Sequence, residues 1–188
     1  MNKMLCLGIS AMFSGIALSA AEPQKMELTG FDNQFESVTP KGEFKKWVFN
    51  DWSKSFNGGG TMTVSDKGRT GKCVALKTGD KQRVCFYSSI SVPVVPGKDT
   101  IETSLFLKGK GSLMIMNYAY NENNKNIGQW SSKKITVDTP EWKEYQFRIP
   151  CTANIKGAKN IRIAPMVFDN SDLLMDDLKI TLIRDIGK

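Results

Sequence analysis

The sequence of 188 residues contains no histidine. This absence excludes the serine–histidine–aspartate and cysteine–histidine arrangements of many hydrolases, histidine-ligated zinc, and the tyrosine–histidine pair of many β-fold lyases. A glycosidase needs only a pair of carboxylates, so composition does not exclude one. Most acidic residues fall in predicted turns, however, and no pair of them is marked by its surroundings. The sequence therefore favours a non-catalytic protein over a small carboxylate-dependent hydrolase.

Long hydrophobic runs are also missing. The longest, residues 4–18, is interrupted by glycine and serine and is shorter than the ~20 residues that a membrane-spanning helix needs. Lys3 precedes it and small residues follow it at 19–21, which is the pattern of a secretory signal peptide. We therefore expect residues 1–21 to be a signal peptide and residues 22–188 to be a single domain without a membrane span. Such a protein is secreted, periplasmic or located at the cell surface.

Clusters of one charge sign are rare. The formal net charge is +7, but lysines and arginines are scattered, with only short pairs such as Lys45-Lys46 and Lys133-Lys134. This distribution lacks the basic stripe of a nucleic-acid-binding protein and supports only a mild preference for acidic polymers. We expect no nucleic-acid partner, and a monomer is the simplest state for a single module.

Cysteine is scarce after the predicted signal peptide, where only Cys73, Cys85 and Cys151 remain. An odd number in an oxidising compartment allows one bridge and one free thiol, or no bridge at all. If the segments on either side of Gly79-Asp80 form a hairpin, alternation puts Cys73 and Cys85 on the same non-core face. A Cys73–Cys85 bridge and buried free thiols are both consistent with this pattern.

The sequence after residue 21 shows period-two alternation punctuated by glycine and proline, with no sustained helical period. Short strands at this spacing in one chain predict an all-β fold, a sandwich of two packed antiparallel sheets. The predicted strands are Gly60–Ser65, Lys72–Thr78, Arg83–Val92, Thr100–Lys108, Ser112–Asn121, Lys134–Val137, Trp142–Ile149, Asn160–Phe168 and Leu173–Ile183.

The last predicted strand carries an acidic residue on a hydrophobic face. Alternation places Asp176 on the same side as Leu174, Leu178 and Ile180. A carboxylate on a core face is costly unless hydrogen bonds or a cation satisfy it. Two interpretations remain open. Either loop amides donate hydrogen bonds to Asp176, or Asp176 coordinates calcium, which binds carboxylate and carbonyl oxygens from loops.

Four segments resemble, in the same order, the motifs of one family. They are Asp32–Glu36, similar to an N-x-x-F-E opening; Gly68–Leu76, similar to G-x-x-G-K-x-x-A-L; Trp142–Phe147, similar to W-x-x-Y-x-F; and Leu174–Leu178, similar to a closing hydrophobic-x-D-D/N-hydrophobic pattern. Asp32 stands where the family has asparagine. The ordered set resembles the galactose-binding-like carbohydrate-binding modules of the CenC type (families 4, 9, 16 and 22).

This resemblance implies a jelly-roll β-sandwich of the galactose-binding-domain type, with a sugar site on the concave sheet face or at the loop edge. It also implies a structural calcium ion held by Glu36, Asp176 and the backbone carbonyl of Lys72. Sugar-contacting residues differ between the families, so the resemblance does not assign them.

Sugar sites combine exposed aromatic rings with planar hydrogen-bonding side chains. Trp130 ends a polar segment and is predicted to be either an exposed platform for a sugar, with Gln129 beside it, or a lid on the sandwich edge. Tyr118 and Tyr120 share one face of a strand, and the pattern does not decide whether that face is core. Arg162 alternates with apolar residues and faces either the concave sheet or water. These five residues are the candidate ligand-binding set.

The leading hypothesis from the sequence is a secreted, non-catalytic carbohydrate-binding module that recognises a polysaccharide or glycan and is stabilised by calcium. The alternative is an envelope-associated structural or interaction protein with a jelly-roll fold and no sugar site. Fold alone does not separate them. The side chains on the concave face separate the two functions. A sugar site needs exposed aromatic side chains there, whereas a structural protein would fill that face with methionine and leucine.

Overall fold

The computed structural model describes residues 22–186. The expected signal peptide, residues 1–21, lies outside the described residues. Within the described range, no helix is long and apolar enough to cross a membrane. The elements are β1 (Gln24–Leu28), β2 (Trp47–Phe49), the 3-10 helix η1 (Asp51–Ser55), β3 (Thr61–Ser65), β4 (Cys73–Lys77), β5 (Val84–Ser88), β6 (Val92–Pro93), β7 (Asp99–Tyr120), β8 (Asn126–Ser131), β9 (Ile135–Pro150), β10 (Asn160–Val167) and β11 (Asp172–Arg184).

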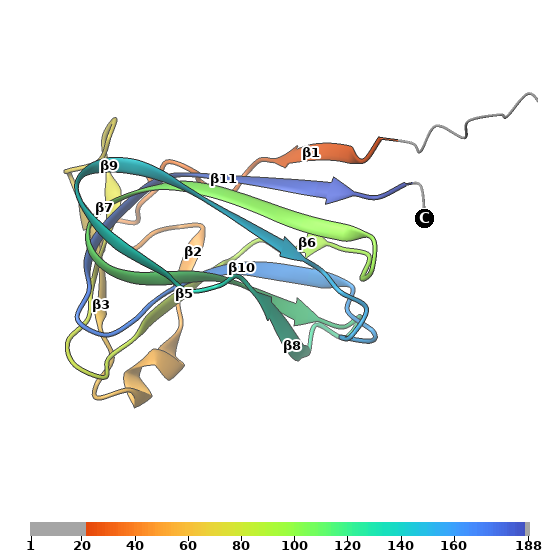
Figure 1. Ribbon diagram of the computed structural model, residues 1–188. Helices are drawn as coiled ribbons and strands as arrows, with labels where there is room; N and C mark the ends of the chain where they lie inside the picture. The colour runs from red at the N-terminus through yellow and green to blue at the C-terminus, as the bar shows by residue number, and fades with distance from the viewer. Residues whose placement is uncertain (1–21, 187–188) are drawn as a thin grey trace, which may run out of the picture.

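The strands form two layers around one hydrophobic core (Figure 1). In this view the upper layer contains β1, β11, the second half of β9 and the first half of β7, and the lower layer contains β5, β6 and β10. Antiparallel pairing links the strands in the order β2-β5-β10-β7-β11-β4-β3, with β1 on β11, β6 on β10, and β8 and β9 on β7. The predicted fold class, an all-β sandwich of antiparallel sheets, is confirmed.

β7 belongs to both layers. Its residues 99–107 pair with β11 and the end of β9, and its residues 113–120 pair with β10. The strand bends between these halves (Figure 1), and Gly109 and Gly111 lie in the sequence between them. A Cβ at Gly109, where φ is +117°, would lie 2.2 Å from the carbonyl oxygen of Asp172, and one at Gly111 would lie 2.3 Å from a serine hydroxyl. Because only glycine allows such close approaches, these residues let one strand serve both sheets.

Alternation sorts the side chains of β7 along its whole length. The odd-numbered residues point into the core, where Leu105, Leu107 and Leu113 are fully buried. Burying each such side chain contributes ~1.5–3 kcal/mol to folding. The even-numbered residues point outward, first from the upper layer and then from the lower one. The strand therefore supplies the outer surfaces of both layers as well as their shared core.

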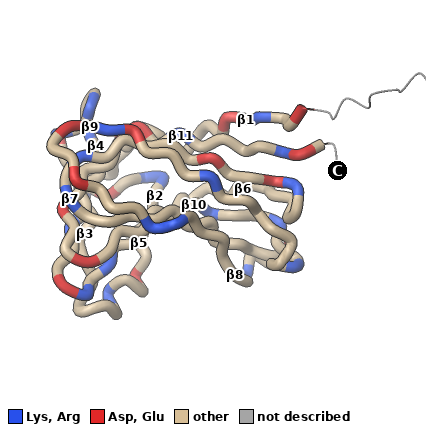
Figure 2. The backbone as a smooth tube through the Cα atoms, viewed as in Figure 1, with Lys and Arg blue, Asp and Glu red and all other residues tan. Residues whose placement is uncertain are grey.

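Acidic residues within strands are distributed unevenly between the two layers (Figure 2). Within strands they occur in β1, β9, β11 and the first half of β7. The described strands β2, β5, β6, β8 and β10, and residues 112–120 of β7, contain none. The two outer surfaces of the sandwich therefore differ in charge.

The sequence pattern predicts the central strands correctly and misses several edge strands. β1 and β2 were not among the predicted strands, and the polar segment expected to be a loop before Trp130 forms β8. β7 and β9 are each continuous, although the glycines of β7 and Pro140 suggested breaks. Glycine and proline inside strands mark bulges and bends as well as turns.

The hairpin predicted between Cys73 and Cys85 does not form. β4 pairs with β3 and β11, whereas β5 pairs with β2 and β10. All three cysteines of the described chain are free and buried. Of the two alternatives that the sequence left open, the structure excludes a Cys73–Cys85 bridge and confirms buried free thiols. Burial raises the pKa of Cys85 to about 11 and that of Cys151 to about 12, because desolvation disfavours the thiolate.

We expect the three thiols of the described region to resist alkylation in the native protein. At about pH 8 they are protonated as well as buried, so iodoacetamide should modify none of them before unfolding and all of them in guanidinium chloride. Mass spectrometry counts the added groups. A bridge between Cys73 and Cys85 would leave only Cys151 reactive in the unfolded, unreduced protein, which would contradict the structure.

Candidate functional site

The outer surface of the lower layer is rich in aromatic and methionine side chains. Even-numbered residues of β7 meet outward-facing residues of β5 and β10 there, and η1 packs on the same side. We call this surface the aromatic face. Its buried members are Cys85, Met116, Tyr118, Ala164 and Met166, and its half-buried members are Trp52, Tyr87, Met114, Tyr120 and Phe168. The half-buried rings are the ones that a ligand can reach.

Three candidate ligand residues form one row across the aromatic face. Tyr118 in β7 lies opposite Gln129 in β8 on one side and opposite Arg162 in β10 on the other. Residues directly opposite each other in antiparallel strands point to the same side of the sheet. Tyr120 follows on the same side of β7. The structure thus brings together four of the five residues that the sequence singled out.

The guanidinium of Arg162 lies against two tyrosine rings. Its Cζ atom is 4.9 Å from the centre of the Tyr120 ring and 5.7 Å from that of Tyr87. Ring quadrupoles attract the cation and help to hold it in place. Within the described chain only its Nε donates a hydrogen bond, to Ser91 Oγ at 3.4 Å. The terminal nitrogens of Arg162 are therefore left for a ligand.

Tyr118 is nearly closed off from solvent, with 9% of its surface exposed. Its hydroxyl lies 3.4 Å from Cys85 Sγ and accepts a 3.5 Å hydrogen bond from Asn50 Nδ2. Burial raises the pKa of Tyr118 above its ordinary value, and the neighbouring Cys85 raises it further. A neutral, buried phenol supports the rings around it, so Tyr87 and Tyr120 are better placed to contact a ligand.

A second group of cations and rings lies where β10 ends. Arg83 Cζ is 4.3 Å from the centre of the Phe56 ring and 5.6 Å from that of Phe168. Lys134 Nζ lies 5.1 Å from the centre of the Phe168 ring. The Phe56 ring packs edge-on against Trp52 of η1 at 5.3 Å between centres. Rings with cations against them therefore stand at both ends of the aromatic face, with methionines between them.

Trp130 points to the opposite side of its strand from Gln129. It lies opposite the buried Asn117, and only 6% of its surface is exposed. Its indole N–H donates hydrogen bonds to Thr152 Oγ1 at 3.1 Å and to Asn154 Oδ1 at 3.0 Å. The predicted exposed platform is therefore wrong, because alternation along β8 sends Gln129 outward and Trp130 into the core.

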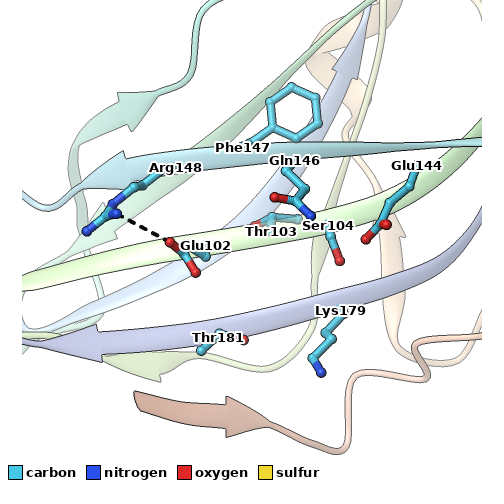
Figure 3. A pocket seen from close by; sticks show the side chains of 9 residues that line it. All are labelled: Glu102, Thr103, Ser104, Glu144, Gln146, Phe147, Arg148, Lys179 and Thr181. Carbon is cyan, nitrogen blue, oxygen red and sulfur yellow. Dashed lines mark ion pairs between the residues drawn. The ribbon is translucent and has the colours of Figure 1, made fainter. Parts of the chain in front are cut away.

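The outer surface of the upper layer is polar. A cavity of 420 Å³ lies over β7, β9 and β11 (Figure 3). The outward-facing side chains that line it include Glu102, Ser104, Glu144, Gln146, Arg148 and Lys179. Both of its cations are paired, since Arg148 Nη1 lies 3.6 Å from Glu102 Oε1 and Lys179 Nζ lies 2.9 Å from Glu27 Oε2. We call this surface the polar face.

The two acids over this cavity are badly spaced for glycoside hydrolysis. Glu102 lies opposite Arg148, whereas Glu144 lies opposite Phe106, four residues further along β7. That offset corresponds to ~13 Å along the strands. Inverting and retaining glycosidases hold their carboxyl groups ~5–9.5 Å apart. The polar face therefore gives the hydrolase hypothesis no support.

Asp176 is buried, as predicted, but not on the predicted face. A β-bulge interrupts the pairing of β11 with β7 after Asp176, and Asp177 has a positive φ of 48°. The bulge shifts the alternation, so the core-facing residues of β11 are odd-numbered before it and even-numbered after it. Asp176 thus points away from the core residues Leu178 and Ile180. The prediction that it shares their face is wrong.

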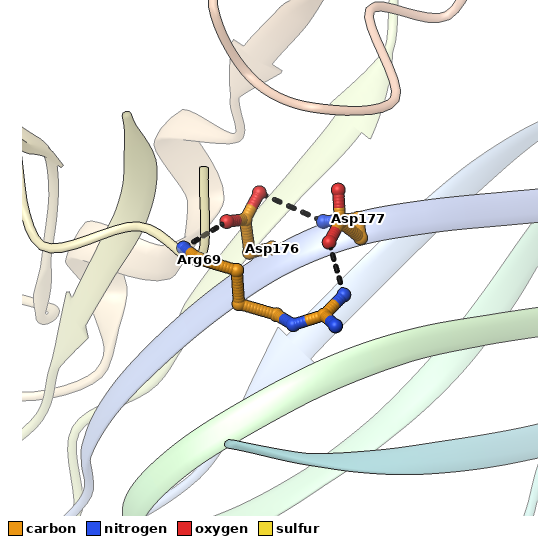
Figure 4. Close-up of polar contacts among 3 residues, drawn as sticks. All are labelled: Arg69, Asp176 and Asp177. Atoms are coloured by element: carbon orange, nitrogen blue, oxygen red, sulfur yellow. Dashed lines mark hydrogen bonds and ion pairs between the residues drawn. The ribbon is translucent and has the colours of Figure 1, made fainter. Parts of the chain in front are cut away.

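A loop covers the Asp176 carboxylate instead. The Arg69 N–H donates to Asp176 Oδ2 at 2.7 Å, and the Asp177 N–H donates to Asp176 Oδ1 at 2.8 Å, while the Arg69 guanidinium pairs with Asp177 (Figure 4). Arg69 also stacks on Phe106, with Cζ 3.5 Å from the ring centre. Burial raises the pKa of Asp176, and the two N–H groups oppose that shift. This is the loop-amide interpretation of the buried acid.

The same loop joins Asp176 to the other predicted calcium ligands. The Lys72 N–H donates to Glu36 Oε1 at 2.8 Å. A Cβ at Gly71 would lie 2.2 Å from that same oxygen, so the loop backbone presses on the carboxylate. The charge of Glu36 contributes to the raised pKa of Asp176, after burial and the charge of Asp177. The described residues contain no group of three or more metal-binding side chains, so a cation here would depend on backbone oxygens.

Sequence reasoning missed several members of the aromatic face. Arg83, just before β5, has the same parity as Tyr87 within it, and Phe168, just after β10, has the same parity as Arg162. Each alternation is visible in the sequence. The pairing of β5 and β7 with β10, which puts these side chains on one surface, is set by long-range contacts that a local pattern does not specify. Trp52 reaches the surface from η1.

No protein-family model matches the chain. No curated protein matches it either.

Several solved structures share the fold. The family 11 carbohydrate-binding module of cellulosomal cellulase Lic26A-Cel5E from Clostridium thermocellum has a TM-score of 0.50 and 16% sequence identity, over 86% of this chain and 95% of that chain. A cyclase from Fischerella sp. TAU has a TM-score of 0.62 and 8% identity, over 85% of this chain and 98% of that chain.

A third match is endo-1,4-β-D-xylanase 10B from Clostridium thermocellum, in a structure of its CBM22-1 and GH10 modules with xylohexaose. The TM-score is 0.51 and the identity 16%, over 78% of this chain and only 27% of that chain. At these identities the likenesses establish the fold alone. The chain has the β-sandwich fold of carbohydrate-binding modules, and a cyclase shares it.

We expect Trp130→Ala to lower the free energy of unfolding by ~3–5 kcal/mol, because it leaves a cavity in the core. Gln129→Ala, one residue away on the outer side, should change it by no more than ~0.5 kcal/mol. Urea unfolding followed by tryptophan fluorescence or circular dichroism measures both. Equal and small changes in the free energy of unfolding for the two variants would contradict the burial of Trp130.

Proposed function

We propose that this protein is a non-catalytic carbohydrate-binding module that is exported from the cytoplasm and binds a polysaccharide or glycan across its aromatic face. One observation carries the proposal. Half-buried rings, two of them against the Arg162 guanidinium, share a sheet surface with an exposed amide, Gln129. Sugar rings present apolar C–H faces edged by hydroxyls, and this surface offers a counterpart to each.

The division of labour follows from the geometry. Tyr87 and Tyr120 pack against the apolar faces of sugar rings. The free guanidinium nitrogens of Arg162 donate to sugar hydroxyl or ring oxygens, and the Gln129 amide both donates and accepts. Tyr118 lies beneath them and fixes the row, because its buried hydroxyl is held by Asn50 and Cys85. The rings are held by packing before the ligand arrives, which lowers the entropic cost of binding.

The proposal predicts that Tyr120→Ala weakens binding to a polysaccharide ligand about tenfold, equivalent to ~1.4 kcal/mol, because it removes one of the half-buried rings. Gln146→Ala on the polar face is the matched control and should leave binding unchanged. Affinity gel electrophoresis against a panel of neutral and acidic polysaccharides, with calcium present, provides the measurement. Absence of binding to every polymer would remove the proposed function.

One observation favours the alternative of an envelope-associated interaction protein without a sugar site. Methionine side chains, two of them buried, fill the centre of the aromatic face, and such side chains adapt to protein partners. The same panel separates the two functions. Loss of affinity in Tyr120→Ala supports a sugar site. A protein whose migration is retarded by none of the polysaccharides fits the alternative.

We also propose that calcium binds beside the loop that covers Asp176. The donor set suits a hard cation, since Glu36 and Asp176 are carboxylates that one loop brings together and whose charges repel each other. Asn33 adds a side-chain oxygen that is buried without a partner, and its carbonyl accepts the Leu178 N–H. Glu36, Asp176 and the Lys72 carbonyl would hold the ion. Bound calcium would neutralise the two carboxylates and tie the loop to β11.

Calcium should therefore raise the melting temperature, and a chelator should reverse the rise. Asp176→Ala should abolish the shift because it removes a ligand. Asp172→Ala serves as the control, since this exposed acid of the same strand pairs only with Lys77. Differential scanning calorimetry with and without calcium measures each variant. If calcium does not change the melting curve of the wild-type protein, the calcium site is contradicted. The loop N–H groups alone would then stabilise the buried carboxylate of Asp176.

A further inference from the structure

We infer that the aromatic face selects anionic glycans, whose sugar units carry a carboxylate or a sulfate ester. The inference rests on the proposed function and adds the ligand class to it. Its basis is a difference between the two outer surfaces of the sandwich: most cations of one are paired with acids, and those of the other lie against aromatic rings.

On and near the upper layer, cations are matched with acids. The pairs are Arg69–Asp177, Lys77–Asp172, Lys108–Glu141, Lys110–Asp138, Arg148–Glu102, Lys179–Glu27 and Arg184–Asp99. The last is a bidentate pair in which Asp99 is 2% exposed. Seven cations of this layer are therefore paired within the protein, and an anionic ligand would meet their acids there. Lys143, 5.7 Å from the centre of the Tyr145 ring, is an exception.

The aromatic face is different. Arg83, Arg162 and Lys134 lie against aromatic rings, and no described carboxylate forms an ion pair with any of them. The described strands of this layer contain no acid that faces a ligand. The nearest acid in η1, Asp51, is paired with Lys54 at 2.9 Å. Within the described residues, Arg83, Arg162 and Lys134 are therefore left without a carboxylate partner and can meet an approaching anion.

The arrangement of these cations suits an extended polymer. Arg162 and Phe168 are six residues apart, ~20 Å along the strand direction. One cation site therefore stands at each end of a surface long enough for several sugar rings, with rings and methionines between them. Hydrogen bonds from a guanidinium to a carboxylate or sulfate are shorter and stronger than those to a hydroxyl. Anionic sugar units at both ends would gain most from this spacing.

Single-stranded nucleic acid also combines rings with phosphates. It presents a charge at every nucleotide, however, and proteins that bind it follow the backbone with a continuous positive groove. The described cations of the aromatic face stand apart, with Arg162 beside Tyr120 and with Arg83 and Lys134 beside Phe168, and buried methionines lie between them. Widely spaced cations fit a glycan with separated charges better.

The test compares ligands that differ only in charge. Isothermal titration calorimetry of the purified protein uses oligogalacturonate against its methyl ester for the carboxylate arm, and dextran sulfate against dextran for the sulfate arm. Oligothymidylate is the nucleic-acid probe. We expect at least one anionic ligand to bind roughly tenfold more tightly than its neutral counterpart, with a preference that declines as salt rises above about 0.1 M.

Arg162→Gln and Arg83→Gln should each reduce that preference several-fold. Arg148→Gln, which removes a paired cation from the polar face, should leave it intact. Equal affinity for charged and neutral forms would overturn the inference while keeping the proposed function. Binding of neither form would overturn both. Loss of the preference in Arg148→Gln alone would place the anion on the polar face and overturn the inference. Tighter binding of oligothymidylate than of any glycan would identify single-stranded nucleic acid as the ligand and overturn it as well.

Discussion

The structure depends on one strand, β7, that keeps a single alternation while it passes from one sheet to the other. Gly109 and Gly111 make this possible, because a side chain would collide with Asp172 of β11 at the first position and with Ser171, just before β11, at the second. Odd-numbered residues remain in the core on both sides of the bend, and even-numbered residues remain outside. A polar outer surface and an aromatic one are thus laid out by the same repeating pattern. A residue inserted near the bend would exchange core and surface for half of the strand.

The local part of this arrangement could be read from the sequence, and the long-range part could not. Alternation and turn residues gave the central strands, the sandwich and the burial of Asp176. The same local reading failed for Trp130, since a polar segment with several asparagines looks like a loop whether or not it pairs with β7 as β8 does. It could not decide between a bridge and free thiols for Cys73 and Cys85, because β4 and β5 do not pair with each other: β4 pairs with β3 and β11, and β5 with β2 and β10.

Asp176 shows how a correct expectation can follow from an incomplete reason. Strict alternation placed its carboxylate among core leucines, where burial without partners is costly. The bulge at Asp177 turns it outward, and the loop carrying Arg69 then buries it against the polar face. The electrostatic problem remains, because Glu36 lies close enough to raise the pKa of Asp176. Loop amides meet part of that demand, and the proposed calcium ion would meet the rest.

The central claim is that ligand binds to the aromatic face and not to the polar one. Amide chemical-shift mapping by NMR during titration with xylohexaose and with oligogalacturonate tests it most directly. The account predicts that the largest shifts cluster at Tyr87, Tyr120, Gln129 and Arg162, on four strands that only the fold brings together. Shifts confined to β1, β9 and β11, or no shifts with either ligand, would contradict it.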